Sequence, residues 1–194
     1  DIFEMAAVYL FHLAGNYAFV DGNNRVAAVA AIVAGPAHAH VSFENAQAAV
    51  GTTYKAILRI PHGCDGKATD GVRIRIPEGV IAVKPMPKAG WTIEKTVTRY
   101  NSAYELHGAK VTEGVTELSW RGGSLADDEY DEFVFRATLD ASLPPGETIY
   151  FPVIQTCGTD RAEWAEVPAE GQTAHDVERP APGLELLHGE HAGH

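Results

Sequence analysis

Residues that could bind a metal ion gather in the stretch Ala37-His38-Ala39-His40. The triplet Ala37-His38-Ala39 has the small-x-small pattern of a signal-peptide cleavage site. A cut after Ala39 makes His40 the first residue of the mature protein. Its free α-amino group and the Nδ1 atom of its own ring can then chelate one Cu(II) ion, since nitrogen donors suit tetragonal copper. The alternative is that His38 and His40 are polar residues of a linker.

The segment before this point carries the other marks of a secretory signal. Residues 26–34 form a short apolar run, Arg25 precedes it, and Gly35-Pro36 ends it. Such a run is too short to span a bilayer as a helix, so it predicts export rather than an anchor. We therefore expect a periplasmic or extracellular location and no transmembrane span in this chain.

The composition is typical of a globular rather than a disordered protein. The chain has 194 residues, of which 45% are hydrophobic, and a formal net charge of −11. This acidic balance argues against nucleic acid or an anionic membrane surface as a partner. The two cysteines, Cys64 and Cys157, both flank turn signals. In an oxidising compartment we expect them to form a disulfide, whereas in the cytosol they would be two buried thiols.

Alternation of apolar and polar residues predicts a β-rich domain after residue 50. Strand signals fall at 52–60, 72–76, 79–83, 91–100, 116–120, 133–139, 149–153 and 162–167. Turns are expected at Gly122-Gly123 and at Pro144-Pro145-Gly146. This spacing favours an all-β fold, an antiparallel β-sandwich of immunoglobulin-like or cupredoxin-like type, preceded by a short helical N-terminal segment.

The N-terminal residues carry a second pattern. Residues 16–25 read Asn-Tyr-Ala-Phe-Val-Asp-Gly-Asn-Asn-Arg before an Ala/Val-rich stretch. Phe19, Asp21, Gly22, Asn23 and Arg25 resemble the motif of the Fic/Doc family, whose loop cradles phosphates at a helix N-terminus. Tyr17 stands where that family has its catalytic histidine, and Ala18 replaces its proline. We interpret residues 1–39 as an inactive Fic/Doc-like fragment, or an upstream reading frame, merging into the signal-like apolar segment.

Five stretches of the remaining chain share a further resemblance. They are His40-Val-Ser, Pro61-His-Gly-Cys64, residues 76–91, Asp131-Glu-Phe133, and Tyr150-Phe-Pro-Val153 with Trp164. Together they resemble the YcnI-like family of bacterial copper-binding proteins over residues 40–182. The resemblance implies an exported β-sandwich whose Cu(II) is held by a single-histidine brace. It implies His40 as the brace histidine, Glu132 as the glutamate ligand and Trp164 as the neighbouring tryptophan.

Two of these assignments have rivals that spacing does not separate. Glu129 competes with Glu132, because both lie in the acidic run 127–132, and such a run is usually a solvated face. Trp120 competes with Trp164, and either tryptophan could instead anchor the core. A tryptophan has no ligating lone pair, so its expected role is to cover an open face of the ion.

These patterns favour a protein that is not an enzyme and that binds copper for homeostasis or delivery. The expected partners are other copper-handling proteins of the cell envelope. A copper oxidase or monooxygenase is the alternative, but such enzymes usually add a second histidine ligand, and the sequence shows no clear one. His62 is a further candidate, although a turn histidine explains it as well. A β-sandwich adhesion module with incidental histidines is the third reading.

The C-terminal residues differ in composition from the rest of the chain. We expect residues 183–194 to be a mobile tail. His188, His191 and His194 are spaced like a loose metal-scavenging sequence. A disordered end that binds nothing specific explains them equally well.

Overall fold

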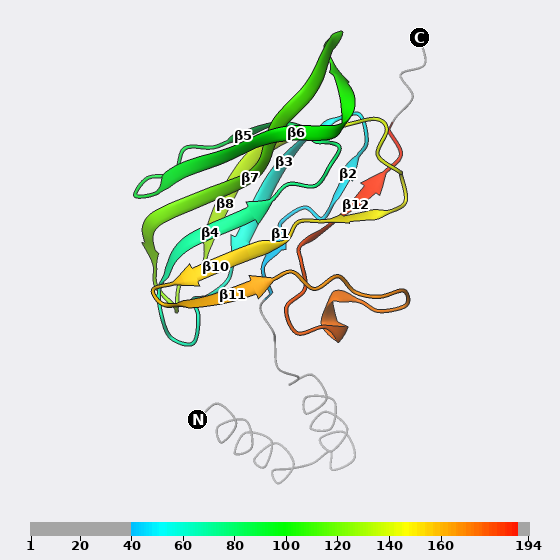
Figure 1. Cartoon of the computed structure of the whole chain (residues 1–194). Helices are drawn as coiled ribbons and strands as arrows, with labels where there is room; N and C mark the ends of the chain where they lie inside the picture. The colour runs from blue at the N-terminus through cyan, green and yellow to red at the C-terminus, as the bar shows by residue number, and fades with distance from the viewer. Residues whose placement is uncertain (1–39, 190–194) are drawn as a thin grey trace, which may run out of the picture. The chain divides into compact units, whose positions relative to one another are not determined.

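Strands make up more than half of the described residues, and many of them carry an alternating apolar–polar sequence. The computed structural model describes residues 40–189, and Figure 1 shows their arrangement. The strands are β1 (Ser42–Phe43), β2 (Gln47–Ala49), β3 (Thr53–Ile60), β4 (Thr69–Arg75), β5 (Val80–Pro85), β6 (Thr92–Leu106), β7 (Ala109–Leu125), β8 (Asp131–Leu139), β9 (Thr148–Tyr150), β10 (Val153–Cys157), β11 (Asp160–Trp164) and β12 (Gly183–Leu187), with a 3₁₀ helix η1 (Ala174–Asp176).

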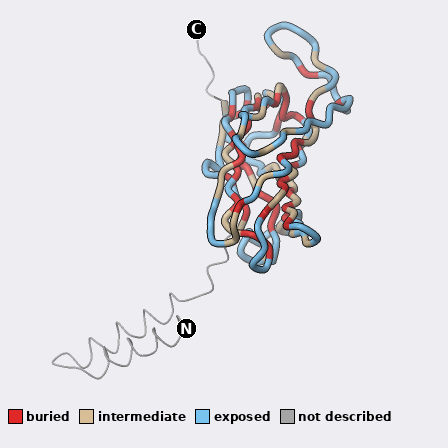
Figure 2. Tube along the Cα trace, turned by 90° about the vertical axis from the view of Figure 1, so that its left-hand side faces the viewer, coloured by how far each residue is buried: buried red, intermediate tan, exposed pale blue. Residues whose placement is uncertain are grey.

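Two sheets form the sandwich. One has the strand order β1-β3-β8-β5 and the other the order β11-β10-β4-β7-β6. Every second side chain of β3 is buried, and alternate residues of β8 and β4 enter the same core, namely Phe133, Phe135, Ala137 and Leu139 with Val72 and Ile74. Figure 2 shows buried and exposed positions alternating along the chain. The predicted all-β sandwich is confirmed.

A third, smaller sheet corrects the expectation of a mobile tail. Its order is β2-β12-β9, with β12 parallel to β2 and antiparallel to β9. Leu184 and Leu186 on β12 are fully buried. The tail prediction is therefore wrong for residues 183–187, because two apolar side chains one strand period apart give this central strand a buried face. His188 is exposed after β12, and His191 and His194 lie outside the described residues.

Two other sequence expectations are corrected. Gly122 and Gly123 lie inside β7 instead of turning the chain. Gly122 has φ +77°, and the ring of Trp91 occupies the place of a Cβ at Gly123, so both positions require glycine. The strand expected at 149–153 is divided between β9 and β10 of different sheets. It divides at Phe151-Pro152, since proline has no N–H to continue the ladder.

Strand β6 is an outer edge of the five-stranded sheet, and its ladder with β7 is interrupted twice. The register shifts between Thr96 and Val97 and again between Arg99 and Tyr104. Glu78 covers the second interruption, since its Oε1 accepts hydrogen bonds from the backbone N–H of Asn101, the backbone N–H of Ser102 and the hydroxyl of Tyr104. The β6–β7 hairpin ends at residues 107–108, at the top of Figure 1.

Residues 1–39 lie outside the described part of the chain. The expected helical segment, the Fic/Doc-like fragment and the cleavage site are therefore not described by the structure. Between residues 40 and 189, no helix has the length and hydropathy needed to cross a membrane.

Candidate metal centre

Trp164 is positioned by the β10–β11 hairpin. It is the last residue of β11, is 6% exposed, and lies opposite Val153 of β10. Its indole Nε1–H donates a hydrogen bond to Oε1 of Gln155 at 3.1 Å. Because a buried N–H needs an acceptor, this bond fixes the direction of the ring.

The same glutamine ties Trp164 to the turn that carries His62. Gln155 is fully buried. Its Nε2 donates to the carbonyl of His62 and to Oγ1 of Thr69, both at 2.7 Å. One amide thus holds a strand, a turn and the indole together.

Two histidines flank this tryptophan, and a third lies beside one of them. The ring centroid of His40 lies 6.1 Å from that of Trp164, and the ring of His62 lies 6.3 Å away in an edge-on contact. The ring of His175 lies 6.2 Å from that of His40, with 37° between the planes. We call these four residues the histidine corner. In Figure 1 the start of the described chain, the end of β11 and η1 lie at the same end of the sandwich.

His175 reaches this corner on a loop that is closed at its base. The backbone N–H of Glu166 donates to the carbonyl of Arg179 at 3.1 Å, and the N–H of Ala181 donates to the carbonyl of Glu166 at 2.8 Å. The side chain of Glu166 also accepts from the backbone N–H of Arg179 at 2.9 Å. We call the enclosed residues, 167–178, the His175 loop.

A capping box orders the turn that contains His175. The backbone N–H and the hydroxyl of Thr173 both donate to Oδ2 of Asp176, at 2.7 and 2.8 Å. The hydroxyl of Thr173 accepts from the N–H of His175 in return. The two hydrogen bonds from Thr173 lower the pKa of the Asp176 carboxyl, and the bond from the backbone N–H has the larger effect. The capped turn therefore remains formed around an ionised aspartate while the ring of His175 is exposed.

Glu132 lies on β8, in the other large sheet from Trp164. It pairs with Arg59 of β3 across the ladder, and its carboxylate lies 3.7 Å from the guanidinium Nε of that arginine. Arg59 also contacts Glu44 at 3.2 Å. The structure thus brings His40 to Trp164, and it places Glu132 in an ion pair with Arg59. The assignment of Glu132 as a copper ligand stays a prediction.

The two rival residues lie in different surroundings. Trp120 is fully buried on β7 and packs edge-on against Phe133 at 5.5 Å, so it belongs to the core. Glu129 is exposed in the turn before β8, where its N–H donates to the carbonyl of Ala126.

Imidazole nitrogens suit copper and zinc. Between residues 40 and 189, no group of three or more His, Cys, Asp or Glu side chains is arranged to hold a metal ion. If residues 1–39 were removed, the α-amino group of His40 would be a further nitrogen donor at the histidine corner.

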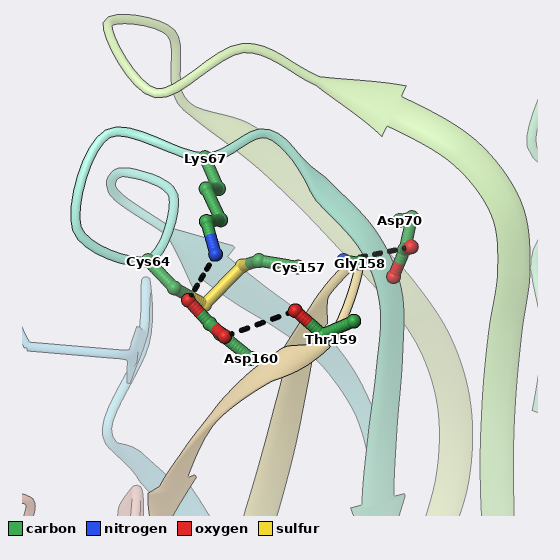
Figure 3. Close-up of polar contacts among 7 residues, drawn as sticks. All are labelled: Cys64, Lys67, Asp70, Cys157, Gly158, Thr159 and Asp160. Atoms are coloured by element: carbon green, nitrogen blue, oxygen red, sulfur yellow. Dashed lines mark hydrogen bonds and ion pairs between the residues drawn. A yellow bond between two sulfur atoms is a disulfide. The ribbon is translucent and has the colours of Figure 1, made fainter.

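The predicted disulfide is present beside this corner. Cys64 and Cys157 are bonded, with a Cα–Cα separation of 5.9 Å. Figure 3 shows the bond together with two polar contacts that join the same segments. Lys67 Nζ lies 2.6 Å from Oδ2 of Asp160, and the N–H of Gly158 donates to Oδ2 of Asp70. The disulfide therefore anchors the turn after His62 to the end of β10.

Sequence reasoning missed His175. It follows the change of composition at Ala169, and nothing in its spacing from His40 indicates contact. The one available signal was Thr173-Ala-His-Asp176, since Thr-x-x-Asp resembles a helix-capping sequence and so predicts an ordered turn in that stretch.

An immunoglobulin-like β-sandwich with a histidine-lined corner is the class of protein that this fold and site define. The chain belongs to the DUF1775 family, a domain of unknown function whose family model matches residues 40–186. This is the family described above as YcnI-like. A model of the Fic/DOC family matches residues 1–34.

Comparison with solved structures supports the fold. An uncharacterized protein from Nocardia farcinica, whose crystal structure reveals an immunoglobulin-like fold, has a TM-score of 0.57 and 22% identity, covering 76% of this chain and 98% of that one. A cohesin of Acetivibrio cellulolyticus scaffoldin B, solved with a Cel5 dockerin, has a TM-score of 0.40 and 8% identity, covering 76% and 97%. The similarity to the cohesin is too weak to show a shared fold or function. A search of curated proteins finds no match.

Proposed function

We propose that this chain is an exported copper-binding protein that serves copper homeostasis or delivery and is not an enzyme. In this proposal, removal of residues 1–39 exposes the amino group of His40. That amine and the His40 ring chelate Cu(II), the cargo of the protein, while Trp164 covers one face of the ion. The observation that carries the proposal is the 6.1 Å approach of the His40 and Trp164 rings.

Glu132 is the proposed oxygen donor. Its ion pair with Arg59 does not prevent this, because both side chains are more than a third exposed. Exposed pairs contribute at most about 1 kcal/mol, so the carboxylate can exchange one partner for another. Arg59 keeps its contact with Glu44 when Glu132 leaves.

The test compares three forms of the domain that differ at the amino group of His40. A chain beginning at His40 is titrated with Cu(II) against a competing chelator, and so is the same chain acetylated at its amino group. A third form keeps the residues that precede His40. We expect tight one-to-one binding only with the free amine, because an amide nitrogen is not a basic donor. Equal affinities of the three forms would show that the amino terminus is not a ligand.

A copper oxidase is the second candidate, favoured by the contact between His40 and His175. Copper enzymes with an N-terminal histidine brace usually have a second histidine ligand, and His175 is a candidate for it. Reductant-driven peroxide formation by the copper-loaded chain, above that of the same concentration of free Cu(II), supports the enzyme. A rate below that of free Cu(II) supports binding and delivery, because the bound ion is withdrawn from redox cycling.

A further inference from the structure

We propose that His175 provides a second imidazole to the copper ion held at His40. This deepens the proposed function and rests on it. The copper site then has three nitrogen donors, namely the amine and ring of His40 and the ring of His175.

The separation of the two rings fits one shared ion. A metal–imidazole bond measures about 2.0 Å and a ring centroid lies about 1.2 Å behind its nitrogen, so two rings on opposite sides of an ion have centroids about 6 Å apart. The rings of His40 and His175 are separated by 6.2 Å. The observed centroid separation is therefore close to that of two imidazoles on opposite sides of one ion, with side-chain rotation directing a nitrogen of each ring at it.

The position of His175 is built into the fold. The His175 loop is closed by backbone hydrogen bonds between Glu166 and the segment at Arg179 and Ala181. Inside the loop, the capping box between Thr173 and Asp176 orders the turn. Because the backbone is already ordered, binding restricts little more than the rotation of one exposed side chain.

Donor chemistry also favours His175. Nitrogen donors suit tetragonal Cu(II), and a second imidazole can occupy an equatorial position. Glu132 must first leave Arg59, whereas the ring of His175 already contacts that of His40. Two nitrogen ligands from distant parts of the sequence would also tie the His175 loop to the start of the domain.

The test counts imidazoles and measures affinity on the chain that begins at His40. Pulsed electron paramagnetic resonance of the Cu(II) form should show two coordinated imidazoles, and His175→Ala should show one. We expect this change to lower the Cu(II) affinity at least about tenfold, since even outer-shell partners contribute that much. His107→Asn is the matched control, because His107 lies in the turn between β6 and β7 and asparagine tolerates its φ of 51°.

The outcomes separate the two proposals. If His40→Ala abolishes binding while His175→Ala changes neither the affinity nor the imidazole count, this inference is wrong and the proposed function stands. If the second imidazole disappears in His62→Ala instead, the inference is also wrong and His62 is the ligand. If acetylation at His40 and His40→Ala both leave binding unchanged, the proposed function itself fails. Thermal unfolding without metal should be equal for His175→Ala and the unchanged chain, since the ring of His175 is exposed.

Discussion

Gln155 accepts a hydrogen bond from the indole Nε1–H of Trp164 at 3.1 Å, and both side chains are buried. The Nε2 of the same amide donates to the carbonyl of His62 and to Thr69. A single side chain therefore sets the position of two members of the histidine corner.

Replacing this amide should affect both stability and the site. Gln155→Leu leaves the N–H of Trp164 and the carbonyl of His62 without this partner in a buried place. We expect a loss of about 3 kcal/mol in the free energy of unfolding, measured by denaturant titration. Gln47→Leu is the control, because Gln47 is a strand glutamine whose bond to Glu185 is exposed. Similar losses in the two variants would contradict the role given to Gln155.

Trp164 should report copper directly. Cu(II) quenches the fluorescence of a nearby indole, so we expect Trp164→Phe to lose most of the copper-dependent quenching of the protein that begins at His40. Trp91→Phe is the control, because Trp91 packs against Phe133 on the core. Quenching that persists in Trp164→Phe and disappears in Trp91→Phe would place the ion elsewhere.

Two substitutions distinguish Glu132 from Glu129 as the proposed copper ligand. Glu132→Gln should weaken Cu(II) binding about tenfold or more, because a neutral amide does not supply an anionic oxygen. The unfolding free energy should change by less than about 1 kcal/mol, since the ion pair with Arg59 is exposed. Glu129→Gln should change neither quantity. A loss of affinity in Glu129→Gln alone would move the ligand to the turn before β8.

The disulfide should contribute strongly to stability. Cys64 and Cys157 are 93 residues apart in sequence. In the chain-entropy model a loop of this length is worth about 4–5 kcal/mol. Reduction, or Cys64→Ser with Cys157→Ser, should lower the free energy of unfolding by that amount. Two titratable thiols in the denatured, unreduced protein would show that the bond is not formed.

Tyr104 makes stability sensitive to alkaline pH. Burial, followed by its hydrogen bond to Glu78, raises the pKa of Tyr104 to about 12. The unfolded chain ionises this phenol near pH ~10. The contribution of Tyr104 to the free energy of unfolding is therefore fully present below pH ~10 and is lost as the pH rises toward about 12. Absorbance titration of phenolate should show Tyr104→Phe losing a late-titrating group, and an unchanged late step in that variant would contradict this assignment.

Much of the fold was predictable, because its information is local. The alternation at 52–60 and 133–139 marks β3 and β8, and turn chemistry at Pro144-Pro145-Gly146 separates strands. The burial of Leu184 and Leu186 was not predictable, because two alternating apolar residues in a C-terminal segment are too weak a signal to indicate a strand. The sequence predicted a turn at Gly122-Gly123, because it does not reveal that the ring of Trp91 lies over Gly123 inside a strand.

The site was predictable only in part. His40 and Trp164 were assigned through family resemblance, and the structure places their rings together. The approach of His175 depends on the closed base of its loop, which involves hydrogen bonds between Glu166 and residues more than a dozen positions away. Such tertiary closure leaves no periodic mark in the sequence.

The broken ladder of β6 bears on how copies of this protein avoid one another. A long, regular outer strand offers a row of N–H and C=O groups on which a second chain can polymerise. Here the register shifts after Thr96 and after Arg99 interrupt that row, and Glu78 occupies the backbone N–H groups of Asn101 and Ser102. Charged side chains, including Glu94 and Lys95, are exposed along the strand. The edge is thus poorly suited to pairing with the same edge of a second copy of the chain.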